Sequence, residues 1–158
     1  PEHFKHELRG SSVVESDHLI LLDENQSVYQ AGIRKEDLTL ADPPVYIYDG
    51  KKWVLSSNTT SEFLIAALSY EAVFTFEYNP EEFYSFTKDD VSTLQSRLTK
   101  LPYKLSKWFG EISFYSNAPD NLVFVLDAGD QIDVLYGAAS EESYVKLLAA
   151  IEGIGEPL

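Results

Sequence analysis

Residues 18–57 read HLILLDENQSVYQAGIRKEDLTLADPPVYIYDGKKWVLSS, and this stretch decides the fold that the sequence predicts. It contains three short apolar runs, Leu19–Leu22, Val45–Tyr48 and Trp53–Leu55. Runs of this length, bounded by Asp, Asn, Gly and Pro, are typical of strands joined by turns. Asp49-Gly50 indicates a hairpin between the last two runs, because glycine readily adopts the positive φ of a tight turn. We therefore expect the stretch to open one antiparallel sheet.

Polar segments separate these runs and are expected to form the turns of the sheet. Asp23-Glu24-Asn25-Gln26 follows the first run, and Asp42-Pro43-Pro44 precedes the second. Between them, Arg34-Lys35-Glu36-Asp37 indicates a polar connector on the surface. We expect Leu38 and Leu40, which follow this connector, to be anchored in the core, because large apolar side chains are usually buried.

Helical spacing of apolar residues begins after the sheet stretch. Thr59-Thr60-Ser61-Glu62 has the capping-box pattern, in which the first hydroxyl accepts from the third helical amide and the Glu reaches back. The spacing behind it predicts a helix from about Thr60 to Phe76 that packs on the apolar face of the sheet. The residues predicted to form the buried face of this helix are Phe63, Leu64, Ala67 and Leu68.

Two further helices are predicted towards the C-terminal end. Thr87-Lys88-Asp89-Asp90 is a second capping box, and it favours a short surface helix over Asp89–Lys100. Ser140-Glu141-Glu142 predicts the start of a third helix, because its two glutamates lie at the positive end of the helix dipole. The predicted buried side of this third helix consists of Tyr144, Val145, Leu147, Leu148 and Ile151.

Three strands are predicted between the second and third helices. They are Ile112–Tyr115, Leu122–Leu126 and Ile132–Tyr136, with Asp127–Asp130 as a hairpin loop before the last. Leu122–Leu126 is apolar throughout, as is typical of a strand covered on both faces. The sequence therefore predicts an α+β fold in which residues 1–158 form a single domain. Its mostly antiparallel sheet has about six strands and is flanked by about three helices.

The composition excludes several kinds of site. The 158 residues include no cysteine, which removes disulfides and thiolate ligands and fits a reducing compartment. No P-loop, G-x-G-x-x-G, G-x-S-x-G or H-E-x-x-H motif occurs. Histidine occurs only at His3, His6 and His18, whereas a metal site needs several converging ligands. We therefore expect no catalytic residue, no metal and no cofactor.

Membrane insertion is not expected either. No apolar run approaches the roughly 18 residues that span a bilayer, and no secretory leader is visible. We therefore expect a cytoplasmic protein. The chain begins at Pro1 and contains no methionine, so we expect the N-terminal part of the domain to be truncated.

The chain is strongly acidic, and the charge is unevenly distributed. The net charge of −14 divides into −6 over residues 1–50, zero over residues 51–108 and −8 over residues 109–158. Such an excess repels nucleic acid and anionic membranes, and it favours encounter with a basic partner. The alternative is that the charge serves solubility alone.

Candidate partner-binding residues lie in the two acidic regions: Asp23, Glu24, Asn25, Gln26, Asp42, Asp127, Asp130 and Asp133. Asp23 and Glu24 adjoin a strand end and point to opposite faces, so they are poorly placed as a general acid–base pair. The segment from Glu24 to Gln26 can instead fix a turn through hydrogen bonds to the backbone. The three later aspartates, spaced by threes, do not match a calcium-binding loop, and a solvated hairpin is the alternative.

Aromatic residues are dense between Tyr70 and Phe86. No basic residue lies among them, so they do not resemble a stacking platform for nucleic acid. They can pack in the core, or they can line a groove that binds a small ligand or a peptide. A hydrolase whose site leaves no motif is a third hypothesis, which the scarcity of histidine disfavours.

The order of motifs in residues 19–72 resembles the SUKH superfamily, which includes bacterial immunity proteins and homologues of a yeast regulator of cell-wall synthesis. The resemblance rests on Glu24–Ile33, reading ENQSVYQAGI, then on Asp42–Tyr46, Trp53 and Ser61–Leu64 in that order. Ala31 stands where the family usually has Trp, and Ser27 replaces a common Gly.

This resemblance implies a non-enzymatic bacterial protein of the cytoplasm that binds and neutralises a toxin. Toxins that act on nucleic acid tend to be basic, so the expected partner is a basic toxin domain, contacted by residues 109–158 or residues 1–50. We expect no nucleic acid and no membrane among the partners, and a monomer or weak homodimer. The alternative is a regulatory domain that binds a small ligand or peptide in the aromatic groove.

Overall fold

The computed structural model describes residues 17–24, 29–80 and 82–158. The chain divides into two compact units, Pro1–Phe63 and Leu64–Leu158, which we call the N-terminal and the C-terminal unit. The described residues form three α-helices and two antiparallel sheets, so the predicted α+β class is confirmed. The first of these helices, α2 (Thr60–Thr75), begins in the N-terminal unit and continues into the C-terminal one, close to its predicted bounds.

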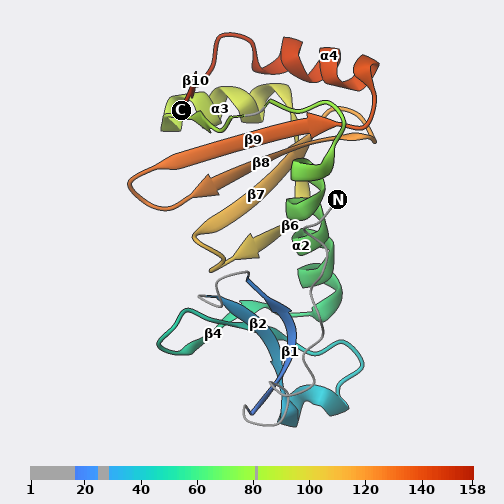
Figure 1. The fold of residues 1–158 in the computed structure, drawn as a ribbon, viewed down its shortest axis with the longest axis vertical. Coiled ribbons are helices and arrows are strands. Elements are labelled where there is room, and N and C mark those ends of the chain that lie inside the picture. The colour runs from blue at the N-terminus through green and yellow to red at the C-terminus, as the bar shows by residue number, and fades with distance from the viewer. Residues whose placement is uncertain (1–16, 25–28, 81) are drawn as a thin grey trace. The chain divides into compact units, whose positions relative to one another are not determined.

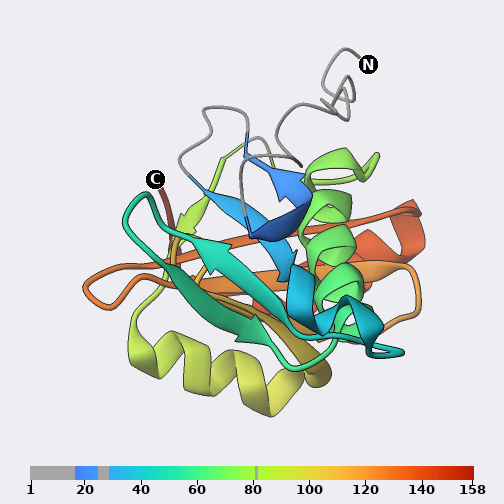
Figure 2. The same ribbon diagram turned by 90° about the horizontal axis from the view of Figure 1, so that it is seen from below.

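The N-terminal unit contains a four-stranded antiparallel meander whose strands pair in chain order (Figure 2). Its strands are β1 (His18–Asp23), β2 (Gln30–Arg34), β3 (Val45–Tyr48) and β4 (Trp53–Ser57). The three predicted strands and the hairpin between β3 and β4 are confirmed, and Gly50 in that hairpin has a φ of 83°. The sheet packs its apolar face inward through Ala31, Ile33, Val45 and Ile47.

The sequence does not predict β2, because Ala31, Gly32 and Ile33 make too short an apolar run between polar neighbours. Gly32 has a specific role in this strand. A Cβ atom at this position would lie 2.9 Å from the carbonyl oxygen of Leu19 on β1. Glycine therefore allows the two strands to approach closely at this point.

The predicted anchoring of Leu38 and Leu40 in the core is wrong. Their side chains are 46% and 52% exposed. The connector forms a 3-10 helix, η1 (Lys35–Thr39), which has no buried residue. The buried apolar residues described in this unit lie on β2, β3 and α2, and the connector lies on the surface together with the leucines that follow it.

The strands do not form one sheet. β1 to β4 make one sheet, and the later strands make a second sheet of six. The four strands of the meander pair in chain order, and the strands that follow α2 pair among themselves. Among the described residues, no strand of one sheet pairs with a strand of the other.

The six-stranded sheet of the C-terminal unit has the order β10-β5-β9-β8-β7-β6. Its strands are β5 (Tyr84–Ser85), β6 (Thr99–Ser106), β7 (Glu111–Ser116), β8 (Asn121–Asp127), β9 (Ile132–Ala138) and β10 (Glu156–Pro157). Helices α3 (Lys88–Arg97) and α4 (Glu141–Ile151) cover the same side of this sheet (Figure 1). The predictions of β7, β8, β9 and the hairpin loop between the last two are confirmed.

β8 is buried on both faces, as predicted. Val123 and Val125 join the core beneath α3 and α4, which also contains Leu94 and Leu147 of those helices. Phe124 alternates with the two valines and therefore belongs to the opposite face, where it is 1% exposed. That opposite face carries the candidate site described below.

β6 is not predicted by the sequence, which places helix up to Lys100. Helix α3 ends earlier, at Arg97, and its predicted capping box between Thr87 and Asp90 is confirmed in both directions. β6 is an edge strand that carries Pro102 and two lysines, Lys100 and Lys104. Proline and lysine are tolerated there because one side of an edge strand has no partner to bond.

The predicted faces of two helices are only partly correct. In α2, Phe63 and Ala67 are buried, but Leu64 and Leu68 are 44% and 67% exposed. Residues 63–68 are apolar without a break, so their spacing does not single out one face. In α4, Leu147 and Ile151 are buried and Tyr144 is half-buried, whereas the predicted core residues Val145 and Leu148 are exposed.

The two glycines after α4 allow a matched test of packing around Phe86. Gly153 and Gly155 have φ values of 76° and 71°, but only at Gly155 would an added Cβ atom overlap the Phe86 ring. Gly153→Ala is expected to cost about 1–2 kcal/mol through backbone strain alone. Gly155→Ala adds an overpacking penalty of about 1–3 kcal/mol, since Phe86 lies in the core. Urea unfolding measures both, and equal losses would contradict the packing of Phe86 against Gly155.

Candidate functional site: an acidic aromatic pocket

A pocket of about 520 Å³ lies in the C-terminal unit. We call it the aromatic pocket. Its lining residues are Tyr70, Glu82, Phe83, Phe109, Phe124, Leu126, Asp133 and Leu158. They come from α2, the segment before β5, the β6–β7 loop, β8, β9 and the residue after β10. Segments far apart in the sequence therefore converge on one site.

Strand alternation explains why an acidic residue lies in this pocket. On β9, Ile132 and Val134 join the core beneath α3 and α4, so Asp133 between them belongs to the opposite face. Asp133 is paired across the sheet with Leu126, which in turn is paired with Ile112. The register thus places one carboxylate at the end of an apolar row.

The aromatic rings of the pocket contact one another around Phe124. The ring centroid of Phe124 lies 5.2 Å from that of Tyr70 and 6.1 Å from that of Phe83. Phe74 on α2 adds contacts of 5.1 Å to Tyr70 and 5.7 Å to Phe124. These tilted and edge-on arrangements are the ones that aromatic pairs prefer. They fix Phe124 beneath the half-buried rings of Tyr70 and Phe83.

The charge of the pocket is entirely acidic. Glu82 is exposed and Asp133 is half-buried, and none of the described lining residues is basic. One oxygen of Asp133, Oδ1, accepts a hydrogen bond from Nε2 of Gln131 at 2.7 Å. A site with apolar rings and uncompensated carboxylates favours a ligand that carries both apolar surface and positive charge.

The β6–β7 loop presents Phe109 to the pocket in a rare backbone conformation. Phe109 and Lys107 have φ values of 60° and 67°, which only glycine adopts without cost. Phe109 is 44% exposed, whereas its neighbour Trp108 is 3% exposed and anchors the loop. Such conformations persist only where the surrounding structure enforces them, and they cluster at binding sites.

Ion pairs and a close backbone contact hold this loop in place. Nζ of Lys107 lies 3.1 Å from Oε1 of Glu111, and Nζ of Lys104 lies 3.2 Å from Oε2 of the same glutamate. A Cβ atom on Gly110 would lie 2.5 Å from the carbonyl oxygen of Asp127 on β8. Glycine therefore allows the end of the loop to lie directly against β8, next to Phe109.

The predicted partner-binding residues of the N-terminal unit are not brought together. Asp23 ends β1 and accepts from Nε2 of Gln30 at 3.3 Å, at the end of the sheet where β3 finishes. The backbone amide of Glu24 donates to the carbonyl of Tyr29, which fits the predicted turn. Asp42 lies before β3, at the opposite end of the sheet. Asn25 and Gln26 lie outside the described residues, as do His3 and His6.

Asp42 has a structural partner. Its Oδ1 accepts a hydrogen bond from the amide of Ser61 at 2.9 Å, and the Thr60 hydroxyl donates to the carbonyl of Pro43 at 2.7 Å. These bonds tie the segment before β3 to the first turn of α2. Half of the predicted capping box at Thr59 is present, because its hydroxyl accepts from the amide of Glu62 at 3.2 Å. The other half differs, since the Thr59 amide donates to the Ser57 hydroxyl and Glu62 accepts from that hydroxyl.

The predicted residues of the C-terminal unit divide between the pocket and the hairpin beside it. Asp133 lines the pocket, while Asp127 and Asp130 belong to the β8–β9 hairpin, which projects beyond its neighbours (Figures 1 and 2). Oδ1 of Asp127 accepts from the amide of Gly129 at 2.8 Å, as in a solvated turn. The alternative reading of a hairpin therefore fits Asp127.

The predicted aromatic groove contributes Tyr70 and Phe83 to the pocket. The sequence does not indicate Phe109 and Phe124, because they lie in a loop and a strand far from the groove. A positive φ at a bulky residue leaves no trace in the sequence, although Gly110 directly after Phe109 marks a turn.

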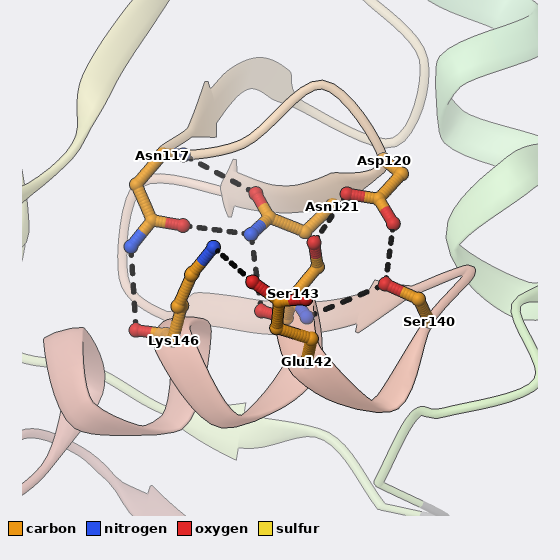
Figure 3. A network of polar contacts seen from close by, with 7 residues as sticks. All are labelled: Asn117, Asp120, Asn121, Ser140, Glu142, Ser143 and Lys146. Atoms are coloured by element: carbon orange, nitrogen blue, oxygen red, sulfur yellow. Dashed lines mark hydrogen bonds and ion pairs between the residues drawn. The ribbon is translucent and has the colours of Figure 1, made fainter.

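A second polar feature ties the β7–β8 turn to α4 (Figure 3). Asn121, 3% exposed, is its centre. Its Oδ1 accepts from the hydroxyl of Ser116 and the amide of Asn117, and its Nδ2 donates to Oδ1 of Asn117 and the carbonyl of Ser143. All polar atoms of the Asn121 side chain are thus bonded within the protein, which indicates a structural role.

Asp120 is the charged member of the same network (Figure 3). Its two oxygens accept from the hydroxyls of Ser140, at 2.6 Å, and Ser143. Ser140 also caps α4, since its hydroxyl accepts from the amide of Ser143. The hydrogen bonds from Ser140 and Ser143 hold the pKa of Asp120 below its ordinary value of 3.8.

The N-terminal unit contains a cluster of aromatic and basic side chains. His18 is 7% exposed and stacks on Trp53, with ring centroids 3.9 Å apart. The guanidinium of Arg34 lies 4.0 Å from the ring centroid of Tyr46. Burial, together with the charge of Arg34, lowers the pKa of His18, which favours the neutral imidazole in this stack.

Two further findings concern metal binding and membrane crossing. In residues 17–24, 29–80 and 82–158, no group of three or more His, Cys, Asp or Glu side chains is placed to bind a metal ion. None of the described helices combines the length and apolar character that crossing a membrane requires.

No family model matches the chain, and neither does any curated protein or solved structure.

The network around Asp120 predicts a pH-dependent stability. The pKa of Asp120 is lowered in the folded state, so its ionised form stabilises the fold above pH 3.8, and this contribution is lost as the pH falls through the folded pKa. Asp120→Asn is therefore expected to lower the urea midpoint at pH 7 and to approach the wild type in acid. Asp130→Asn removes the same charge from the exposed hairpin and is the control. If the urea midpoints of the wild type and Asp120→Asn differed by the same amount at all pH values, the lowered pKa of Asp120 would be contradicted.

Proposed function

We propose that the protein binds a basic protein partner and that the aromatic pocket is its contact site. The observation that carries this proposal is the presence of Glu82 and Asp133 in one apolar pocket with the rings of Tyr70, Phe83 and Phe109. An aromatic anchor site surrounded by charge of one sign is how many protein interfaces combine affinity with selectivity.

The distribution of charge supports a basic partner. Residues 109–158, which supply Phe109, Phe124, Leu126 and Asp133 to the pocket, have a net charge of −8. An acidic surface accelerates encounter with a basic protein and repels nucleic acid, whose phosphates carry the same sign. Five of the eight lining residues thus belong to the part of the chain with the strongest negative charge.

The resemblance to the SUKH superfamily supports a specific biological role for this binding. In that role the protein acts in the bacterial cytoplasm as an immunity protein, without enzymatic activity, and its partner is a basic toxin domain. The residues that carry the resemblance precede Ala72, whereas seven of the eight pocket residues follow it, Tyr70 being the exception. The two lines of support therefore rest on different parts of the chain.

A second candidate function is the binding of a small ligand or peptide, which the volume of about 520 Å³ favours, since ligand pockets are commonly of that size. A thermal-shift screen separates the two candidates. A ligand that binds only the folded state raises the unfolding temperature in a concentration-dependent way. A neutral compound that does so, and that fails with Phe83→Ala, would favour the second candidate.

The proposal is tested by measuring association with the product of the reading frame that neighbours its gene. We expect the association rate to fall by about tenfold or more between low and high salt, because steering between opposite charges is screened. We also expect the double variant Glu82→Gln, Asp133→Asn to bind at least about tenfold more weakly, because it leaves the cationic group of the partner unpaired.

The matched control is the double variant Asp89→Asn, Glu141→Gln. It removes the same charge from α3 and α4, which lie on the other side of the sheet from the pocket. Equal weakening by both double variants would show that net charge, not the pocket, governs binding. No association with the neighbouring product would overturn the toxin-partner form of the proposal.

A further inference from the structure

We infer that the aromatic pocket selects arginine over lysine, so that one arginine side chain of the partner is the anchor of the interface. This inference rests on the proposed function and goes further by naming the group that is recognised. It follows from the combination of flat rings and carboxylates in a single site, together with the forced conformation of Phe109.

The planar guanidinium suits such a site better than an ammonium group. Its face stacks on an aromatic ring while its N–H groups donate to a carboxylate in the same plane. An ammonium is a compact and strongly hydrated charge that cannot do both at once. The pocket contains both kinds of group, since its lining includes the rings of Phe83 and Phe109 and the carboxylates of Glu82 and Asp133.

The N-terminal unit shows the same combination within the protein. The guanidinium of Arg34 lies 4.0 Å from the ring centroid of Tyr46, and its Nη1 lies 3.6 Å from Oε1 of Glu36. By contrast, Nζ of Lys100 lies 5.9 Å from the ring centroid of Tyr115. Arg34 therefore contacts a ring and a carboxylate together, whereas Lys100 lies further from its ring.

Phe109 is the pocket residue whose conformation most directly supports a role in recognising arginine. A bulky side chain at a φ of 60° carries a backbone cost that glycine or asparagine would reduce. The loop nevertheless holds Phe109 in this strained conformation, and the residue is 44% exposed at the pocket. The ring packs edge-on against Trp108, with ring centroids 5.8 Å apart, and its exposed part is open to a ligand in the pocket.

Short peptides test the inference directly. Ac-Gly-Leu-Arg-Leu-Gly-amide is titrated into the isotopically labelled full chain, and the amide shifts of Phe83, Phe109 and Asp133 are followed by NMR. Parallel titrations use peptides with lysine or with neutral citrulline in place of arginine. We expect the arginine peptide to bind about tenfold more tightly than the lysine peptide, and the citrulline peptide to shift nothing.

Variants of Phe109 separate recognition from folding. Phe109→Leu keeps an apolar side chain but removes the flat ring, so it is expected to abolish the preference for arginine over lysine. Phe109→Tyr keeps the ring and is expected to preserve the preference. Phe109→Gly relieves the backbone strain, so it is expected to raise the urea midpoint of the free protein while weakening the arginine peptide about tenfold.

The outcomes distinguish this inference from the proposed function. Equal binding of the arginine and lysine peptides at the pocket would overturn arginine selection and leave a basic partner in place. Shifts confined to residues outside the pocket would overturn both the anchor and the pocket as contact site. A Phe109→Gly variant that is less stable than the wild type would show that the ring serves folding, which also overturns the inference.

Discussion

Burial of β8 on both of its faces is the constraint on which the C-terminal unit depends. Val123 and Val125 fill the core beneath α3 and α4, and Phe124 fills the opposite face beneath Tyr70 and Phe74 of α2. Each fully buried side chain of this kind contributes about 1.5–3 kcal/mol. A one-residue slip in register would exchange the two sets, so the alternation fixes which residues of the neighbouring strands reach each face.

The pocket is a consequence of that register. Once β8 is fixed, β9 must direct Asp133 to the face that carries Phe124, although its partner Leu126 on β8 is apolar. An ionisable group at such a position does little for packing, and Phe109 carries a backbone cost at its positive φ. Both residues belong to the lining of one pocket, and departures of this kind are expected at functional sites.

Local patterns in the sequence predict much of the fold. They do not predict which strands pair when those strands are far apart in the sequence. The β3–β4 hairpin, the cap at Thr87 and the strand at residues 122–126 follow from signals a few residues long. The division into two sheets and the edge strand β6 depend on which strands pair, and spacing carries no such information. The predicted burial of Leu64 and Leu68 is wrong because α2 is apolar around its whole circumference at that point, so spacing does not identify its buried face.

The candidate site is predictable only in part for the same reason. Tyr70 and Phe83 belong to one aromatic-rich segment, and Asp133 belongs to a visibly acidic hairpin. Their meeting with Phe109 and Phe124 is a product of the fold. The acidic residues of the N-terminal unit seem equivalent in sequence, yet Asp23 and Asp42 lie at opposite ends of their sheet, each with its own structural hydrogen bond.

The chain has two tryptophans, and the structure assigns one to each unit. Trp53 stacks on His18 in the first meander, while Trp108 is buried beside Phe109. Intrinsic fluorescence therefore contains two separable signals. Emission of Trp53 reports on the meander and on the protonation of its imidazole neighbour, and emission of Trp108 reports on the loop at the pocket. Single-tryptophan versions of the protein would reveal whether the two halves melt as one cooperative body or in sequence.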